Sequence, residues 1–367
     1  MCTATADPTG EVHRIREEQL QFLRFLAFLN IFIAHAERWK FFPYPASHCA
    51  NAAVSFFFML SGMVTAFSLA GKDITLSAGA EIRFLHKKLK KFYPLYLVTT
   101  LLTVIYSAIP QQMIVCDYPG VGASLLQLGK NLLLLQSWFP ENAHSFNSVG
   151  WFLSTLMFLY ACSLPAAWLL NKPAKGKHRC LALSAGFVAV TFLIVVYCYL
   201  TQENMSYWHY QFPPARLGEY LMGMIMGYLA VAVKPNKPGG SVWRWIYTAA
   251  EIFAIVFWCF CLKRPGNYWR NHNVSWLIPN TVLLTVFAVG GGWVSELFRC
   301  RPLVYLGDIS FECYLVHQII ITRLAMYTME LPPSEEGNVF CFLFSLLLSV
   351  VVAWFLHTGN AAAGKRR

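Results

Sequence analysis

Long apolar stretches recur along the whole of this chain. A helix that crosses a lipid bilayer needs about 20 mostly apolar residues, and ten stretches approach or reach that length. Their predicted bounds are 20–36, 50–70, 92–109, 150–170, 181–200, 216–233, 245–262, 275–291, 303–326 and 339–357. The sequence therefore predicts an all-α integral membrane protein with about ten transmembrane helices.

Charged residues are scarce. They make up 13% of the 367 residues, whereas soluble globular proteins average about 25%. This number of charged residues is too small to cover the surface of a water-soluble fold of this size. A soluble protein is therefore excluded. The net charge of +11 could suggest a nucleic-acid partner in a soluble protein. In a membrane protein its distribution between loops matters more, and we expect no nucleic-acid partner.

Basic residues alternate between the segments that separate the apolar stretches. If the N-terminus is cytoplasmic, 20 of the 29 Lys and Arg residues fall in inside segments and 6 in outside segments. Three remain within apolar stretches, namely Arg24, Arg216 and Arg323. This split follows the excess of basic residues found in cytoplasmic loops. It predicts that both termini are cytoplasmic.

The predicted organisation is one membrane domain with two short ends. Residues 1–19 form a cytoplasmic segment, residues 20–357 the ten-helix domain and residues 358–367 a basic cytoplasmic tail. The apolar piece 125–139 is shorter and contains Lys130. It is expected to lie at the membrane interface or to dip into the protein.

Two ionisable residues share one face of the first predicted helix. Arg24 and His35 are 11 residues apart, so their side chains lie about 20° apart in projection and roughly 16 Å apart along the axis. Ionisable groups within a membrane usually mark function. Histidine can exchange a proton near neutral pH, and arginine can hold phosphate or carbonyl oxygens. The alternative is an arginine that extends to the interface and an interfacial histidine.

This pair belongs to a pattern that resembles the membrane-bound acyltransferase-3 family. Ten residues separate Arg24 from His35, and a phenylalanine-rich run that ends in Ser61-Gly62-Met63 follows. Members of that family show an Arg/Lys-X10-His signature and then a run ending in Ser-Gly-Phe, so Met63 is a mild departure.

Four further segments follow in the family's order, and together they extend the resemblance over residues 20 to 355. They are Lys87-Lys-Leu-Lys-Lys-Phe-Tyr-Pro94, Trp151-Phe-Leu-Ser154, Arg216-Leu-Gly-Glu219 with Gly223, and Leu306-Gly-Asp-Ile-Ser-Phe-Glu-Cys-Tyr-Leu-Val-His317. A glutamate that many members carry after the Trp-X-Leu-Ser element is missing, as is a glutamate-proline pair near the C-terminal end.

The resemblance implies an acyltransferase that moves an acyl group, most often acetyl, from acyl-CoA to a hydroxyl of a carbohydrate or lipid acceptor. It implies His35 as general base with Arg24 as its catalytic partner. The residues expected to bind substrate are Ser61, Trp151, Arg216, Glu219, Tyr314 and His317. The donor is expected at Lys87, Lys88, Lys90 and Lys91, an alternative being anionic lipid. Acyl-CoA is a substrate here, and no bound cofactor or metal is expected.

Two other functions stay open at this point. A ten-helix transporter or flippase could line a path with Arg24, His35 and Arg216, although no inverted repeat is evident. A non-catalytic member of the same family is the second alternative. The sequence does not identify the acceptor, the acyl length or the oligomeric state. Cys49 and Cys116 both fall in predicted outside segments, and a disulfide between them is a minor alternative.

Overall fold

The computed structural model describes residues 17–44, 47–107, 121–170, 205–233, 238–263, 273–328 and 335–364. Within these ranges every regular element is a helix, which confirms the predicted all-α class. The longer helices are α1 (Glu18–Arg38), α2 (Ser47–Leu69), α3 (Ala78–Ser107), α9 (Leu217–Val233), α10 (Ser241–Lys263), α12 (Leu277–Val289), α15 (Ser310–Thr328) and α16 (Glu335–Gly364).

Shorter helices connect and extend these elements. The α-helices among them are α4 (Val121–Leu132), α5 (Trp151–Ala161), α6 (Ser163–Leu170), α8 (Met205–Tyr210), α13 (Trp293–Phe298) and α14 (Arg301–Asp308). The 3-10 turns are η1 (Gln136–Trp138), η2 (Pro140–Asn142), η3 (Ser148–Gly150), η5 (Pro213–Arg216) and η7 (Asn273–Trp276).

Several of these helices have the length and composition to cross a membrane. Five single helices qualify, and two bent pairs, α5 with α6 and α14 with α15, raise the number to seven in the described part. The pairs bend by 42° and 57°. The predicted stretch 181–200 and Cys116 lie outside the described residues. The count of ten, the cytoplasmic termini and the Cys49–Cys116 disulfide therefore stay predictions.

The lysines at 87–91, which the sequence predicts to lie in an inside segment, are part of helix α3. Helix α3 begins at Ala78, well before the apolar stretch, and continues to Ser107. The segment before the apolar residues is rich in Lys, Ala and Leu, which are strong helix formers. The end of a hydrophobic stretch marks where a helix passes from lipid into water, and the helix itself can continue. The piece expected at 125–139 forms α4 and η1, outside the candidate spans.

Small residues bring α2 and α9 into backbone contact. A Cβ atom added to Gly62 would lie 1.9 Å from the Tyr220 carbonyl oxygen, and one added to Gly223 would lie 1.8 Å from that of Met59. Only glycine fits at such distances. Because apolar burial does not drive helices together within lipid, close packing of this kind stabilises helix pairs there.

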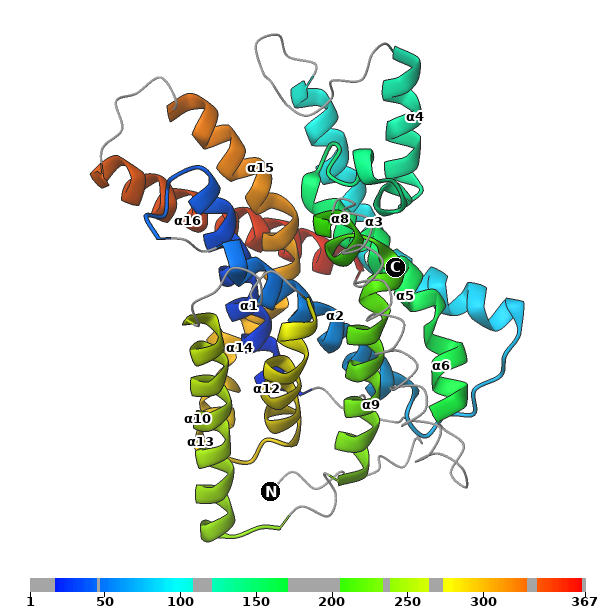
Figure 1. The fold of residues 1–367 in the computed structure, drawn as a ribbon, viewed down its shortest axis with the longest axis vertical. Helices are drawn as coiled ribbons and strands as arrows, with labels where there is room; N and C mark the ends of the chain where they lie inside the picture. Colours follow the sequence, from blue (N-terminus) through cyan, green and yellow to red (C-terminus); the bar gives the residue numbers. More distant parts are fainter. Residues whose placement is uncertain are drawn as a thin grey trace.

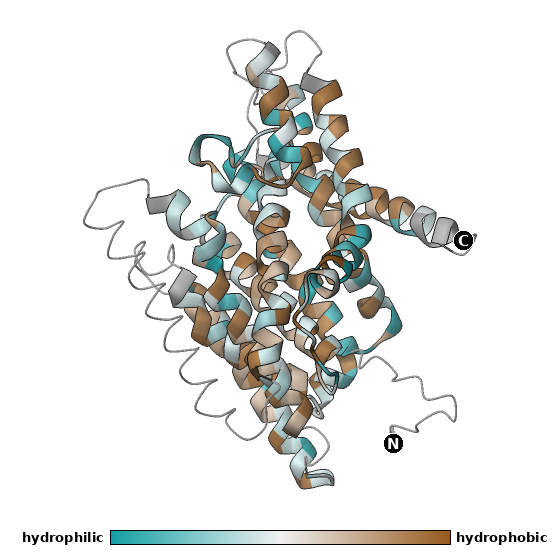
Figure 2. Ribbon diagram, turned by 90° about the vertical axis from the view of Figure 1, so that its right-hand side faces the viewer, coloured by the Kyte–Doolittle hydropathy of each residue, from teal (hydrophilic) through white to brown (hydrophobic). Residues whose placement is uncertain are grey.

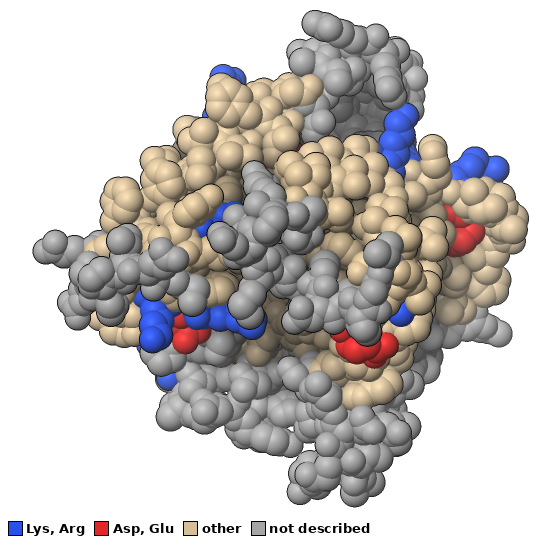
Figure 3. Space-filling model, turned by 90° about the horizontal axis from the view of Figure 1, so that it is seen from above, with Lys and Arg blue, Asp and Glu red and all other residues tan. Residues whose placement is uncertain are grey.

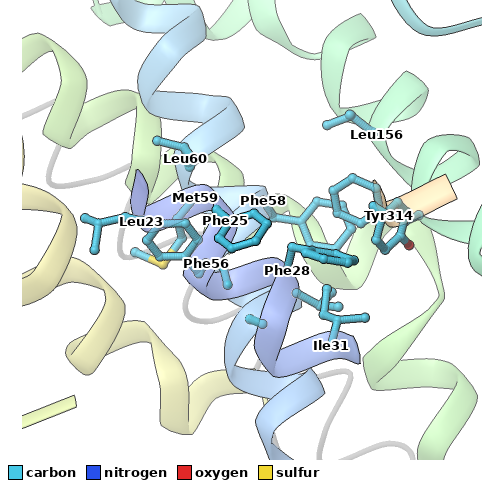
Figure 4. Packing of buried hydrophobic residues seen from close by; sticks show 14 of the residues in the cluster. Leu23, Phe25, Phe28, Ile31, Phe56, Phe58, Met59, Leu60, Leu156 and Tyr314 are labelled. Carbon is cyan, nitrogen blue, oxygen red and sulfur yellow. The ribbon is translucent and has the colours of Figure 1, made fainter. Parts of the chain in front are cut away.

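An aromatic core fills the space beside this contact. Phe28 from α1 and Phe56 and Phe58 from α2 are fully buried, and Leu156 and Tyr314 close the cluster from α5 and α15 (Figure 4). Helix α1 therefore passes through the centre of the molecule (Figure 1), where its side chains meet residues from distant parts of the chain.

The outer faces of peripheral helices are apolar. On α10 and α16 the exposed large side chains include Ile252, Phe253, Phe344, Leu347 and Phe355, and apolar residues recur along the helices in Figure 2. Seen from above, most of the described surface is uncharged, with scattered acidic and basic side chains (Figure 3). Such a surface suits lipid and not water.

The longer helices run in both directions through the molecule. In Figure 1, α1 and α10 run up the page and α2, α9 and α12 run down it. In this view Arg24 therefore lies nearer the lower end of α1 and His35 nearer its upper end.

Candidate active site

His35 meets a second histidine from the other end of the chain. Nδ1 of His35, on α1, lies 2.9 Å from Nε2 of His317, on α15. The ring planes are within 7° of parallel and the centroids are 5.0 Å apart. Non-bonded carbon atoms prefer separations of about 3.5 Å or more. The two nitrogens are closer than this. The rings therefore meet edge to edge through a hydrogen bond.

His317 is held firmly within its own helix and core. Its Nδ1 lies 2.7 Å from the carbonyl oxygen of Tyr314, and its side chain is fully buried. Phe28 meets the imidazole at 82° with 5.6 Å between the centroids. The 57° bend between α14 and α15 separates this part of the chain from α14, which packs against the start of α1 through Gly307.

A loop between η2 and η3 is attached to the same helix. The Tyr314 hydroxyl donates to the carbonyl of Val149 at 2.8 Å, and the Asn147 amide donates to that of Leu315 at 3.3 Å. Phe146 adopts a φ of 55°, a left-handed conformation that is rare for a bulky residue. The loop is thus constrained to one path beside α15.

This loop carries His144, a residue that sequence analysis did not select. Its Nδ1 lies 3.3 Å from the Ser148 carbonyl oxygen, and its Nε2 contacts the Gln211 amide. His144 and Arg38 are close enough to His35 to interact with it electrostatically. No spacing pattern links these residues, because each comes from a different loop or helix end.

Arg216 and Glu219 form the ion pair that their three-residue spacing allows. Nη1 of Arg216 lies 3.0 Å from Oε1 of Glu219, and both side chains are buried. The guanidinium lies over the rings of Phe58 and Tyr210, at 4.8 and 5.2 Å. Its Nε and Nη2 atoms have no hydrogen-bond partner among the described residues, so they are available to a ligand oxygen.

Aromatic contacts connect this ion pair to the histidines. Trp151 lies 4.9 Å from Tyr210, and Phe152 lies 4.5 Å from Phe58 and 5.6 Å from Tyr314, as ring centroids. Trp151, Arg216, Glu219, Tyr314, His317 and His35 therefore belong to one continuous group, although they come from α1, α5, η5, α9 and α15.

Arg24 and Ser61 belong to a second group, nearer the lower ends of α1 and α2. Arg24 is half-buried and donates to the Gln21 side chain at 2.9 Å. It lies close enough to Tyr160 for an electrostatic interaction, and the Tyr160 hydroxyl is within hydrogen-bonding reach of Ser61. The structure therefore separates Arg24 from His35 along one helix, as their spacing predicts.

The four lysines predicted to bind the donor differ in their surroundings. Lys88 is half-buried, donates to Thr65 at 3.0 Å and lies 4.5 Å from the ring of Tyr160. Lys87, Lys90 and Lys91 are exposed. Lys88 thus joins the group of Arg24, Ser61 and Tyr160. Across the described ranges, no cluster of His, Cys, Asp or Glu could hold a metal ion.

A family model described as an acyltransferase domain matches residues 17–358. The chain belongs to the acyltransferase-3 family. It is also 28% identical over 375 residues to the acyltransferase MdmB of Streptomyces mycarofaciens, covering 94% of this chain and 90% of that protein. No solved structure matches the chain. The chain is therefore a membrane acyltransferase of this family.

Proposed function

We propose that this acyltransferase moves an acetyl-type acyl group from acyl-CoA to a hydroxyl of a carbohydrate or lipid acceptor, with His35 as general base. The observation that carries the proposal is the placement of His35. Its imidazole is half-buried and forms a hydrogen bond with a fully buried histidine, His317. The chain that carries it belongs to the acyltransferase-3 family. A base held in this way can accept a proton without first having to reorient.

In the proposed reaction His35 takes the proton of the acceptor hydroxyl as that oxygen attacks the thioester carbonyl. The new C–O bond forms, the C–S bond breaks, and the proton passes to the leaving CoA thiolate. The acyl group is then an ester on the acceptor, and His35 is neutral again. Arg24 and Arg216 would form charge-assisted hydrogen bonds with oxygens of acyl-CoA or of the hydroxyl acceptor. These bonds would stabilise the polar groups of the substrates in this low-dielectric site.

The second group suits the phosphates of the donor. Arg24 and Lys88 both lie near Tyr160, toward the end of α1 that the sequence predicts to be cytoplasmic. CoA is cytosolic and polyanionic, so cations at this end would bind its phosphates. The long pantetheine arm would then extend along α1 over the roughly 16 Å to His35. The acceptor would occupy the upper group, beside Arg216, Glu219 and Trp151.

The proposal is tested with the full chain in proteoliposomes. Radiolabelled acetyl-CoA is supplied with n-octyl β-D-glucoside, a hydroxyl acceptor with both a sugar and an apolar tail, and labelled ester is quantified. We expect label transfer, and a loss of about 100-fold or more for His35→Ala, the usual range for a general base. His86→Ala is the matched control, because His86 is exposed on α3.

Two results would contradict the proposal. One is full transfer activity in a folded His35→Ala protein, which would show that His35 is not the general base. The other is movement of an unmodified solute across the membrane with no covalent product, which would favour a transporter.

A further inference from the structure

The contact between the two histidines fixes the position of a proton. The Tyr314 carbonyl can only accept, so Nδ1 of His317, 2.7 Å away, is the donor. A neutral imidazole has one N–H group, so Nε2 of His317 is then an acceptor. This acceptor lies 2.9 Å from Nδ1 of His35. His35 must therefore donate through its own Nδ1–H.

One consequence concerns the other nitrogen of His35. With hydrogen on Nδ1, the neutral ring leaves Nε2 unprotonated. We propose that His317 is a positioning residue that holds His35 in the Nδ1–H tautomer, so that Nε2 is the atom that receives the proton of the acceptor hydroxyl. This inference rests on the proposed function of His35, and it adds the partner that selects the reactive nitrogen.

The other proton arrangements are unfavourable. If His35 carried its hydrogen on Nε2, two lone pairs would face each other across 2.9 Å. If His317 instead carried hydrogen on both nitrogens, a positive charge would be buried among Phe28, Phe32 and Tyr314. An unpaired charge in such surroundings is costly.

The arrangement also favours the reaction as charge develops. When Nε2 of His35 takes the proton, the ring becomes an imidazolium whose Nδ1–H already points at a neutral acceptor. The bond to His317 then becomes charge-assisted and stronger. An interaction that strengthens only as the proton moves lowers the barrier to reaction and not merely the energy of the bound state.

Nitrogen NMR of histidine tests the inference directly. In ¹⁵N-histidine protein reconstituted in lipid, the two neutral tautomers give distinct ring signals, and the His35 signals are assigned by their loss in His35→Gln. We expect His35 to be in the Nδ1–H form in the unsubstituted protein at neutral pH. An Nε2–H signal for His35 in that protein would overturn the inference, whether or not any variant folds.

Substitutions at position 317 supply the second arm. His317→Leu cannot accept a hydrogen bond, so we expect His35 to move toward the Nε2–H tautomer that free histidine favours. We also expect kcat to fall about 10–100-fold, typical for loss of an orienting partner, with the KM for acetyl-CoA unchanged. His317→Gln restores a carbonyl acceptor at the end of the side chain and should retain more of both properties.

The outcomes separate the two proposals. If His35 stays in the Nδ1–H form in folded His317→Leu, or if the Leu and Gln variants lose activity equally, the positioning role is wrong. If the unsubstituted protein transfers no acyl group, the proposed function fails, yet the tautomer of His35 can still be measured.

Discussion

His144 is exposed, yet the surroundings of its imidazole favour the neutral form. Loss of solvation among neighbouring atoms lowers the pKa of His144 below the ordinary value of 6.5. The hydrogen bond to the Ser148 carbonyl opposes this shift, and the positive charge of Arg38 adds to it. His144 also lies close enough to His35 to interact with it electrostatically.

This shift predicts a pH-dependent stability. Below pH 6.5 the unfolded chain binds a proton at His144 before the folded protein does, so stability falls as the pH drops toward the lowered pKa of the folded state. His144→Gln removes this group. We expect its melting temperature to fall less than that of the unsubstituted protein between pH 7.5 and 5.5. Equal falls in thermal unfolding would contradict the assignment.

Lysine side chains on α3 give a second prediction at this scale. Lys88 contacts Thr65 and Tyr160, whereas Lys87 is exposed one residue away. If Lys88 binds donor phosphate, Lys88→Ala should raise the KM for acetyl-CoA severalfold, and Lys87→Ala should change it little. Initial rates over a range of acetyl-CoA concentrations check this. Equal effects of the two substitutions would indicate general electrostatic attraction instead.

At the scale of elements, the α2–α9 contact makes the most specific demand on the sequence. Gly223 lies against a main-chain carbonyl, which cannot rotate away as a side chain could. Gly223→Ala should therefore force the helices apart and destabilise the protein by at least about 1–3 kcal/mol, the usual cost of overpacking. Unfolding measurements in a mild detergent would detect this.

A glycine in open space supplies the control. A Cβ atom at Gly129 in α4 would meet nothing within 4 Å, so Gly129→Ala should be neutral or stabilise the helix by up to about 1 kcal/mol. If Gly223→Ala were as stable as Gly129→Ala, the two helices would not be in backbone contact.

A buried carboxylate joins another pair of elements. Glu251, from α10, is fully buried and accepts bonds from the backbone N–H groups of Gly292, Val294 and Ser295 at 2.9–3.2 Å. These groups lie at the start of α13, where helical N–H groups lack partners within the helix. Glu251 therefore anchors the turn between α12 and α13 to α10.

For the whole molecule, the central prediction is orientation. The distribution of Lys and Arg places the segment before α2 outside and the segment after it inside. Tyr44 and Asp73 are exposed and lie on opposite sides of α2. In a background without reactive native cysteines, Tyr44→Cys should react with an impermeant maleimide on intact cells, and Asp73→Cys only after permeabilisation. The reverse pattern would invert the topology.

Much of the architecture could be predicted because it depends on local properties. The length of an apolar stretch identifies a membrane helix wherever it packs, so the bounds of α1, α2 and α10 are close to those predicted. The relation between Arg24 and His35 follows from helix geometry alone. The Arg216–Glu219 pair follows from the same periodicity.

The parts that could not be predicted depend on solvent or on distant packing. Hydropathy did not reveal that α3 begins at Ala78, because a helix can continue out of the membrane. Spacing could not distinguish Lys88 from Lys87, because the partners of Lys88 come from α2 and α5.

The sequence by itself determined a helical membrane protein of the acyltransferase-3 type, with a histidine and an arginine on one face of its first helix. Only the tertiary structure placed His317, 282 residues away in the chain, against Nδ1 of His35. A helix fixes relations over a few turns, whereas this contact depends on the bend before α15 and on the packing of α1 at the centre of the molecule.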